Sequence, residues 1–471
     1  MLDKTKMTEA EVSRLVRAIE ARTGILGLRV DGVSPWQLVR FEASLALQNL
    51  SPRRQNAIRS TILKSLLKGA AQAVRGIRKA DYVCKTFDSA LRIFDGGRYR
   101  DIYFDDILDR KAGGVKISSS DAAGYDEARS KAKIAPVFDD TSIIALSAIL
   151  GRVAPRYKRH HVFEQIADAI RLGAGLEGFS SARVARVYNV FWWRVLLYRL
   201  LLARMRAKSV FAADSGQFAL MRASEILGIR FTEVQHGVCT NIHPNMLPGD
   251  IEPEVRRGLL APSQFAVYGE HSKDALSGTM LAREERIAKV GATYIDTARS
   301  VREREWKPDG PVILTVTAQG VAMEQLGTFL ARFLANCGDD VVVNLKLHPA
   351  YNGDETYYRT EFDRDPRVKI IGGQSEVGTH RLIAMSHLHL SISSTCHYDA
   401  LGIGTPTGIL ALETHESVLD IVGKEGVILI NSPEGLADIV AGRHFPNVPD
   451  PVRRHFFEAG FADNMVDLIP R

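Results

Sequence analysis

Three short segments carry side chains that can move a proton or hold a phosphate. In the first, residues 234–237, His236 directly follows a predicted strand and Gly237 lets the chain turn sharply. An imidazole in that position can act as a general base near neutral pH. The alternative is a histidine that packs in the core or caps a helix, and this segment alone does not decide between the two.

The second segment, residues 345–349, ends a predicted strand at a His–Pro pair. Pro349 has no backbone N–H to donate, so the strand is expected to stop at His348. An imidazole at the edge of a sheet can donate a hydrogen bond to a leaving phosphate or protonate it. Lys346 precedes His348 by two positions, which places both side chains on one face of the strand. The alternative is a His–Pro pair that merely ends a strand.

The third segment, residues 391–395, lies where an apolar strand gives way to a helix. Ser393, Ser394 and Thr395 offer hydroxyl groups beside the free backbone N–H groups of a helix start, and such a group of donors can bind an anion. The alternative is that one of these side chains simply caps the helix.

The elements that position these segments alternate along the second half of the chain. Apolar stretches that predict strands are separated by amphipathic stretches that predict helices, which is typical of a doubly wound parallel sheet with ligands at the carboxyl ends of its strands. Thr317, Gln319 and Gly320 follow the first strand of this half, so we expect their loop to approach the same phosphate or its sugar. The expected strands are residues 312–316, 341–347, 368–371, 388–393, 407–412 and 426–430, and the expected helices are residues 321–336, 376–386 and 433–441, with another from Thr395.

The first half of the chain predicts a second unit of the same kind behind extra N-terminal helices. Thr8 and Glu11 have the spacing of a capping box ahead of one helix, and residues 36–75 also look helical. The expected strands are residues 82–87, 209–213, 229–234, 265–268 and 287–290, with a helix at residues 216–227.

Two polar stretches are expected to lie outside the regular elements. Residues 113–135 are rich in Gly, Ser, Asp and Lys and predict a surface loop, and residues 297–310 predict a linker between the two units. The chain is therefore expected to divide into residues 1–297, residues 298–445 and a helical tail of residues 446–471.

A basic segment precedes the first alternating region. Residues 151–208 contain 12 Arg or Lys and 3 Asp or Glu, a local charge of +9. Within it, residues 191–202 are apolar with interspersed arginines and predict a buried helix that leads into the next strand. The alternative is a surface helix on an anionic membrane, where arginine reaches outward and tryptophan lies at the interface.

The composition excludes several classes of protein. The chain has 471 residues, of which 45% are hydrophobic and 25% charged, so it is expected to be globular and water-soluble. The net charge of +6 is mild, and no nucleic-acid reading motif is present, so a nucleic-acid partner is not expected. The four cysteines form no CxxC pair, which fits a reducing cytosol, and no apolar run reaches the roughly 18 residues that a membrane span needs.

Taken together, the three segments resemble the motifs of bacterial GT-B transferases that build surface polysaccharide. This group comprises capsule and O-antigen glycosyltransferases, bacterial sialyl- and Kdo-transferases, and polyglycerol-phosphate polymerases. In these families a His–Pro motif and a serine-rich motif hold the donor phosphate, and they match His348-Pro349 and Ser393-Ser394-Thr395. The polymerases also carry a His–Gly motif whose histidine is implicated as the base, and His236-Gly237 is similar to it.

The resemblance leaves the base open. Bacterial sialyltransferases place two acids before a glycine in the acceptor domain, whereas Asp214-Ser215-Gly216 offers one acid here. Asp214 can therefore be the base in place of His236, or it can cap the helix that follows.

The resemblance implies an α/β fold of the GT-B type, with two Rossmann-like domains that face a cleft. Residues 1–297 would hold the acceptor and residues 298–445 the nucleotide-activated donor. The implied reaction moves a sugar from a nucleotide-sugar to a hydroxyl of an oligosaccharide or lipid-linked glycan, without a metal or other cofactor. We expect a cytoplasmic protein that contacts the anionic inner face of the membrane through its basic segment.

Three other functions stay open from the sequence. A polyol-phosphate transferase of the CDP-glycerol type would share all three motifs and differ in its donor. A nucleotide-sugar epimerase would need no separate acceptor. A non-catalytic nucleotide-sugar-binding protein would bind the donor without turnover.

Overall fold

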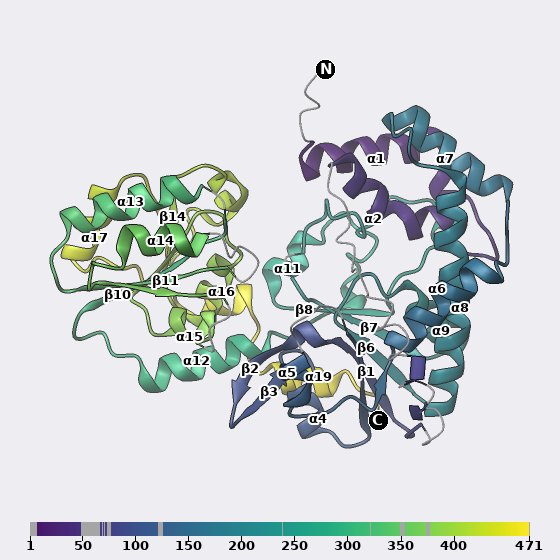
Figure 1. Cartoon of the computed structure of the whole chain (residues 1–471), viewed down its shortest axis with the longest axis horizontal. Coiled ribbons are helices and arrows are strands. Elements are labelled where there is room, and N and C mark those ends of the chain that lie inside the picture. The colour runs from purple at the N-terminus through teal and green to yellow at the C-terminus, as the bar shows by residue number, and fades with distance from the viewer. Residues whose placement is uncertain are drawn as a thin grey trace. The chain divides into compact units, whose positions relative to one another are not determined.

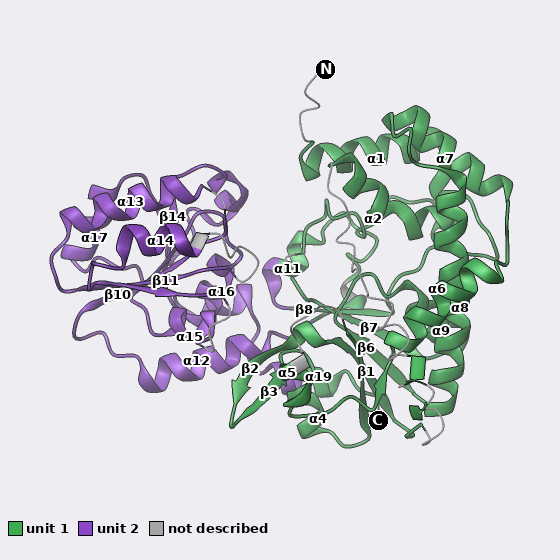
Figure 2. Ribbon diagram, in the orientation of Figure 1, with its two compact units in different colours: residues 1–267, 272–288, 465–471 green, residues 268–271, 289–464 purple. Residues whose placement is uncertain are grey.

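The computed structural model describes the chain except for residues 1–6, 49–65, 68, 70, 73–76, 121–125, 238, 321, 349–353, 374–376 and 471. It divides the chain into two compact units (Figure 2). Unit 1 comprises residues 1–267, 272–288 and 465–471, and unit 2 comprises residues 268–271 and 289–464. Each unit is built around one sheet.

The sheet of unit 1 is doubly wound. From β1 the chain continues outward to β4 and β5 on one side, and then returns to β6 beside β1 and continues through β7 and β8 to β9 on the other. The pairs from β5 to β8 are parallel. The strands, in sheet order, are β5 (Phe138–Asp139), β4 (Gly114–Ser119), β1 (Tyr82–Phe87), β6 (Ser209–Ala212), β7 (Arg230–Val234), β8 (Gln264–Val267) and β9 (Ile287–Lys289). The strand order therefore reverses between β1 and β6, which is the position where such sheets bind ligands.

Helices cover this sheet and extend from it (Figure 1). They are α1 (Glu9–Thr23), α2 (Pro35–Leu47), α4 (Asp105–Arg110), α5 (Asp126–Ser130), α6 (Thr141–Val153), α7 (His161–Ala174), α8 (Ser181–Met205), α9 (Phe218–Ile226) and α10 (Pro253–Arg256). A hairpin, β2 (Leu91–Asp95) and β3 (Arg98–Asp101), also belongs to this unit. The long helix α8 packs on α6, α7 and α9 and buries Val195, Tyr198 and Leu202 in the core of the sheet. This buried face confirms that residues 191–202 form part of a packed helix.

The sheet of unit 2 repeats the same winding. All five of its strand pairs are parallel, and the strand order reverses between β10 and β13. The strands, in sheet order, are β12 (Val368–Ile371), β11 (Val341–Lys346), β10 (Val312–Thr317), β13 (Leu388–Ser391), β14 (Thr407–Leu410) and β15 (Val427–Ile430). The strands are almost wholly apolar because helices cover both faces of the sheet.

The helices of unit 2 are α12 (Thr293–Glu305), α13 (Met323–Asn336), α14 (Asp354–Phe362), α15 (Thr379–Ala384), α16 (Cys396–Ile403), α17 (Pro433–Ala441) and α18 (Asp450–Phe456), with a 3-10 helix at His415–Ile421. Two more helices, α11 (Glu270–Ala275) and α19 (Phe461–Asp467), lie where the chain passes between the units.

The fold class predicted from the sequence is confirmed: the chain is an α/β protein with two Rossmann-like doubly wound units and extra N-terminal helices. Every predicted strand is present within a residue or two of its expected ends. The capping box of Thr8 and Glu11 is formed, and α2 confirms the start of the helical stretch predicted from residue 36. Much of the rest of that stretch lies outside the described residues. That the two units face each other across a cleft stays a prediction.

The predicted surface loop at residues 113–135 is wrong in its first part, because residues 114–119 form the buried strand β4. The polar residues that suggested a loop form ion pairs and hydrogen bonds within unit 1. Lys116 forms ion pairs with Asp101 and Asp105, and the hydroxyl of Ser119 donates to Asp140 Oδ1 at 2.7 Å. A strand with satisfied polar side chains does not show the apolar pattern on which the prediction depended.

The predicted linker at residues 297–310 is also wrong in its first part, because α12 runs to Glu305. Its buried face, with Ile295, Ala298 and Val301, packs on α15 and α16 within unit 2. The predicted boundary at residue 297 therefore lies inside a helix of unit 2. The predicted tail after residue 445 supplies α18, which packs on α16 as part of the same unit.

Candidate active site

The switch point of unit 2 brings the third predicted segment together with the loop after β10. Gln319 follows β10, and Ser393 follows the neighbouring strand β13. The backbone N–H and the hydroxyl of Ser393 both donate to Gln319 Oε1, each at 3.1 Å. Residues that are far apart in the sequence thus meet where a doubly wound sheet binds its ligand.

A third strand contributes to the same place. Thr414 follows β14, and its hydroxyl lies 3.1 Å from the hydroxyl of Ser393. Ser394 bonds the start of α16, because its hydroxyl accepts from the backbone N–H of Cys396 at 3.2 Å. Thr395 is exposed and makes no side-chain cap to the helix. Helix capping therefore uses Ser394, and the hydroxyls of Ser393 and Thr395 do not serve it.

The loop after β10 turns through Gly320, whose φ of 70° lies in the left-handed region that favours glycine. Thr317 does not present its hydroxyl to this loop. Its Oγ1 lies 3.0 Å from Nε2 of His389, and its carbonyl accepts from the hydroxyl of Ser391 at 2.7 Å. A donor contact of Thr317 remains a prediction, and the side chain itself is used inside the sheet.

A buried chain of side chains lies next to these strand ends. Nδ1 of His389 is 2.8 Å from Thr407 Oγ1, which is 2.6 Å from Nδ1 of His397. Burial lowers the pKa of His389 well below its usual value, and it lowers that of His397 to about 4. Both imidazoles are therefore neutral at pH 7, and their hydrogen bonds join the end of β10, the interior of β13 and the start of β14.

The other predicted donor residues lie at the end of β11. Lys346 is its last residue, His348 is exposed two residues later, and Pro349 lies outside the described residues. Lys346 is buried, and its Nζ donates to the carbonyl oxygens of Gly372 at 2.6 Å and Gly373 at 3.4 Å. Burial lowers the pKa of the Lys346 ammonium. Lys346 thus holds the loop after β12, and a contact between it and a donor stays a prediction.

The switch point of unit 1 places Asp214 at the end of β6. Its Oδ1 accepts from the backbone N–H of Gly216 at 2.9 Å, and its Oδ2 accepts from the side-chain amide of Gln217 at 2.7 Å. These bonds fix the orientation of a half-buried carboxylate in the turn before α9. Asp214 therefore bonds the turn rather than the first residues of the helix, which begins at Phe218.

His236 follows the next strand, β7, and is exposed. The turn that carries it is fixed on both sides, because Tyr103 Oη donates to the carbonyl of His236 at 3.2 Å and Gln235 Nε2 donates to the carbonyl of Gly237 at 2.8 Å. His236 is thus exposed after a strand, as expected, and its role as a base stays a prediction.

A second histidine, His243, lies within electrostatic range of both predicted bases. Burial lowers its pKa to about 4, with His236 adding to the shift and the charge of Asp214 opposing it. Its Nδ1 accepts from the backbone N–H of Asn245 at 3.2 Å, as a neutral imidazole can. Asp214 and His236 thus follow neighbouring strands of unit 1, and both act electrostatically on His243.

Sequence reasoning missed His243, His389, His397 and the buried Glu233. His243 precedes Pro244 and so forms a second His–Pro pair, which the same motif search could have found. His389 is flanked by leucines inside an apolar strand, which gives no signal of a polar network.

These positions define two chemically different edges. Unit 2 offers hydroxyl groups, the free backbone N–H groups at the start of a helix, and an exposed imidazole, which are groups that can bind a phosphate. Unit 1 offers a fixed carboxylate and an exposed imidazole, which suit proton transfer. Among the described residues, no group of three His, Cys, Asp or Glu is arranged to hold a metal ion, and no helix is long and apolar enough to cross a membrane.

No protein-family model matches the chain, and no curated protein matches its sequence. Solved structures with a similar fold include UDP-GlcNAc 2-epimerases. One from Neisseria meningitidis, bound to UDP-GlcNAc, is 15% identical, with a TM-score of 0.46 over 82% of this chain and 98% of that one. Another, from Methanocaldococcus jannaschii, is 15% identical, with a TM-score of 0.47 over 82% of this chain and 99% of that one.

The wall teichoic acid polymerase TagF is also similar. One of its structures is 13% identical, with a TM-score of 0.44 over 94% of this chain and 98% of that one. At this level of identity and of structural overlap, we carry neither an activity nor a residue's role over to this chain.

Proposed function

We propose that the chain is a glycosyltransferase that moves a sugar from a nucleotide-activated donor to a hydroxyl of a growing bacterial surface polysaccharide. The observation that supports this most is the meeting of Ser393 and Gln319 at the switch point of unit 2. That meeting joins the serine-rich motif to the loop after β10, at the place where a doubly wound sheet binds a nucleotide phosphate.

On the donor side, the leaving phosphate would be stabilised by groups that stand at the ends of successive strands. The hydroxyl of Thr395 and the imidazole of His348 can donate hydrogen bonds to its oxygens, and the hydroxyl of Ser393 can do so once it leaves Gln319 Oε1. The N-terminus of α16 adds a favourable dipole. Such donors accelerate the reaction because the phosphate gains charge as the bond to the sugar breaks. The proposal assigns this stabilisation to side chains and backbone, without a metal.

On the acceptor side, Asp214 or His236 would take the proton from the acceptor hydroxyl as it attacks the sugar carbon. Asp214 is held in one orientation by two hydrogen bonds, which suits a group that must meet a defined proton. The bond between the sugar and the phosphate breaks as the new glycosidic bond forms, so the nucleotide leaves with the bonding electrons.

A transferase for an activated polyol phosphate is the second candidate. The exposed His236 at the end of β7 supports it, because the resembling polymerases use a histidine before a glycine as their base. The attacking hydroxyl would then bond to phosphorus, and the released nucleotide would be a monophosphate.

The test is a donor screen with the purified full chain. We expect one of UDP-, GDP- or CMP-activated sugars to release its nucleotide only when an acceptor saccharide is present, with an elongated product in the mass spectrum. Turnover of CDP-glycerol in place of every sugar donor would support the second candidate. A changed sugar with donor alone would show an epimerase, and no turnover of any donor by folded protein would contradict both proposals.

A further inference from the structure

In the contact between Gln319 and Ser393, one oxygen atom accepts two hydrogen bonds from one residue. The backbone N–H and the hydroxyl of Ser393 both donate to Gln319 Oε1, each at 3.1 Å. A backbone N–H can only donate, so the amide atom that faces it is the oxygen. Ser393 lies two residues before Thr395, the N-cap of α16, so its N–H is not one of the free N–H groups of that helix. The loop after β13 therefore holds a single oxygen atom between two donors.

Thr414 determines the direction of these hydrogen bonds. Its Oγ1 lies 3.1 Å from Ser393 Oγ. A hydroxyl has one proton to donate, and Ser393 donates its proton to Gln319, so the hydroxyl of Thr414 donates to Ser393. Thr414 has a φ of 77°, in the left-handed region that a β-branched residue rarely adopts. Backbone strain of this kind is concentrated at ligand sites, which is the role proposed for this edge of unit 2.

Gln319 supplies an uncharged amide oxygen where the proposed donor would bring a charged phosphate oxygen. Hydrogen bonds to a charged acceptor are roughly twice as strong as those between neutral groups. Because Ser393 has one N–H and one hydroxyl proton, the amide and the phosphate compete for the same two donors. Gln319 and Ser393 are both half-buried rather than enclosed, so a ligand can enter this competition.

We infer that Gln319 Oε1 occupies the place of an oxygen of the donor's phosphate, and that the donor binds Ser393 only after the side chain of Gln319 has left it. The inference rests on the proposed function for the identity of the ligand as a nucleotide-activated donor. It assigns to Gln319 the opposite effect from a residue that contacts the phosphate directly. A direct contact would raise the affinity for the nucleotide, whereas an internal competitor lowers it.

The size of this effect follows from the two hydrogen bonds that must break. A ligand that binds only the open form has an apparent Kd equal to its intrinsic Kd divided by the fraction of open molecules. Two neutral hydrogen bonds of ordinary net strength correspond to a ratio of closed to open molecules of about 10. Removing the amide should therefore tighten nucleotide binding about tenfold.

The test is a calorimetric titration of the full chain with UDP, GDP, CDP and CMP. We expect the nucleotide that binds the wild type to bind Gln319→Ala about tenfold more tightly. The matched control is Asn336→Ala, which removes an exposed amide at the C-terminal end of α13, where Nδ2 of Asn336 donates to the carbonyl of Arg332. This control should bind the nucleotide as the wild type does.

Two further variants of Gln319 separate the loss of the acceptor from the loss of volume. Gln319→Met keeps a side chain of similar length without the amide, so it should tighten binding as Gln319→Ala does. Gln319→Glu replaces the amide with a carboxylate, which accepts more strongly from Ser393 and repels a phosphate. This variant should weaken nucleotide binding about tenfold or more.

Unchanged or weaker nucleotide binding by folded Gln319→Ala and Gln319→Met would overturn the inference, and so would unchanged or tighter binding by Gln319→Glu. The donor screen separates this failure from failure of the proposed function. Sugar transfer by a wild type whose Gln319→Ala variant binds the nucleotide more weakly contradicts only the role of Gln319. Tighter binding by Gln319→Ala without turnover of any donor contradicts only the transferase. No nucleotide binding by the folded wild type or by any variant contradicts both.

Discussion

At the switch point of unit 2, the side chains that meet at the ends of β10, β13 and β14 are Gln319, Ser393 and Thr414, all of them neutral. At the switch point of unit 1, the corresponding strand ends carry Asp214 and His236, with His243 and Glu233 close to them. The two sheets share one winding, so topology does not explain this difference. Hydroxyls and amides can hold an anion without changing charge, whereas a carboxylate and an imidazole can accept a proton.

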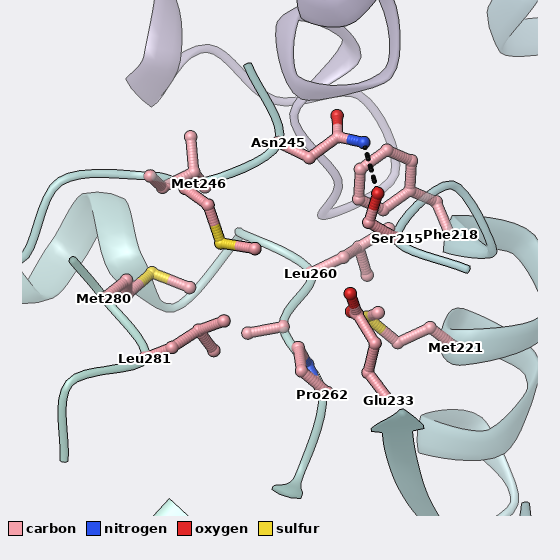
Figure 3. Close-up of a pocket in the computed structure, with 12 residues that line it drawn as sticks. Ser215, Phe218, Met221, Glu233, Asn245, Met246, Leu260, Pro262, Met280 and Leu281 are labelled. Carbon is pink, nitrogen blue, oxygen red and sulfur yellow. Dashed lines mark hydrogen bonds between the residues drawn. The ribbon is translucent and has the colours of Figure 1, made fainter. Parts of the chain in front are cut away.

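The buried polar side chains near the two switch points also differ. In unit 2 the neutral imidazoles of His389 and His397 bond Thr317 and Thr407 and so connect β10, β13 and β14. In unit 1 the buried carboxyl of Glu233 has an oxygen with no partner beside a pocket (Figure 3). The two edges therefore differ in the charge of their side chains and not in whether every buried polar atom is paired, because Nε2 of His397 in unit 2 is also buried without a partner.

The largest expected effect is loss of the base in unit 1. If Asp214 is the base, Asp214→Asn lowers kcat by roughly 10³-fold and leaves the donor Kd unchanged, because general-base catalysis contributes about that much. If His236 is the base, His236→Ala has this effect instead. Single-turnover rates and donor titrations of both variants measure it.

The controls for this experiment are Asp168→Asn and His161→Ala, which change exposed side chains on α7. Both should retain wild-type rates. If both Asp214→Asn and His236→Ala retain the full rate, neither residue is the base. The proton-transfer role assigned to this edge of unit 1 would then be wrong.

The next largest effect is expected for His348 in unit 2. His348→Ala should lower kcat by roughly 10²-fold, as the loss of one donor to a developing anion does elsewhere. The matched control is His444→Ala, since His444 is an exposed histidine after α17. Equal rates for the two variants would exclude His348 from stabilising the leaving phosphate.

A smaller effect is expected for the hydroxyl of Ser393. Ser393→Ala removes one hydrogen bond to a charged group and should raise the donor KM about tenfold. Ser432→Ala, which removes the cap of α17, is the control, because it should lower thermal stability without changing the donor KM. A donor KM that rises equally in both variants would mean that Ser393 acts only on stability.

The pH dependence of folding tests the charge state of Glu233. Its carboxyl ordinarily titrates at 4.5 but has a pKa of about 8 in the folded chain. Between these values the folded state holds a proton that the unfolded state has released, so this group makes stability fall as pH rises from 4.5 to about 8. Glu233→Gln should remove that part of the slope in urea unfolding, whereas Glu225→Gln should not. Identical slopes in wild type and Glu233→Gln would show that the carboxyl is not held neutral.

The smallest effect is expected for the basic segment. On α8, Arg199, Leu200 and Arg204 are exposed, whereas the guanidinium of Arg194 donates to Ser147. We expect Arg199→Gln to weaken binding to vesicles with anionic lipid about fivefold, at about 1 kcal/mol per charge. Flotation with neutral vesicles is the control, and equal binding of both proteins to anionic vesicles would contradict a membrane contact there.

The strand pattern predicted most of the fold because most strands of the two sheets are buried and rich in apolar residues. The surface-loop prediction failed at β4 because the buried charge of Lys116 is paired with carboxylates inside the unit. The linker prediction failed at α12 because this helix is rich in charged residues and has only a narrow apolar face.

The motifs predicted Ser393, His348 and His236 at strand ends because glycine, proline and hydroxyl residues mark those ends in the sequence. They could not predict that Ser393 bonds Gln319, that Thr317 bonds His389 or that Glu233 lies in a pocket. Those contacts depend on which strands become neighbours, and strand order is not encoded in any single segment.

Calorimetric titration of the full chain with UDP, GDP, CDP and CMP tests the central claim most directly. The account predicts that one of them binds, that Ser393→Phe weakens this binding by about tenfold or more by placing a ring at the switch point of unit 2, and that Asp214→Asn leaves it unchanged. Binding that is lost in Asp214→Asn and retained in Ser393→Phe, or no binding of any of the four by folded protein, would contradict it.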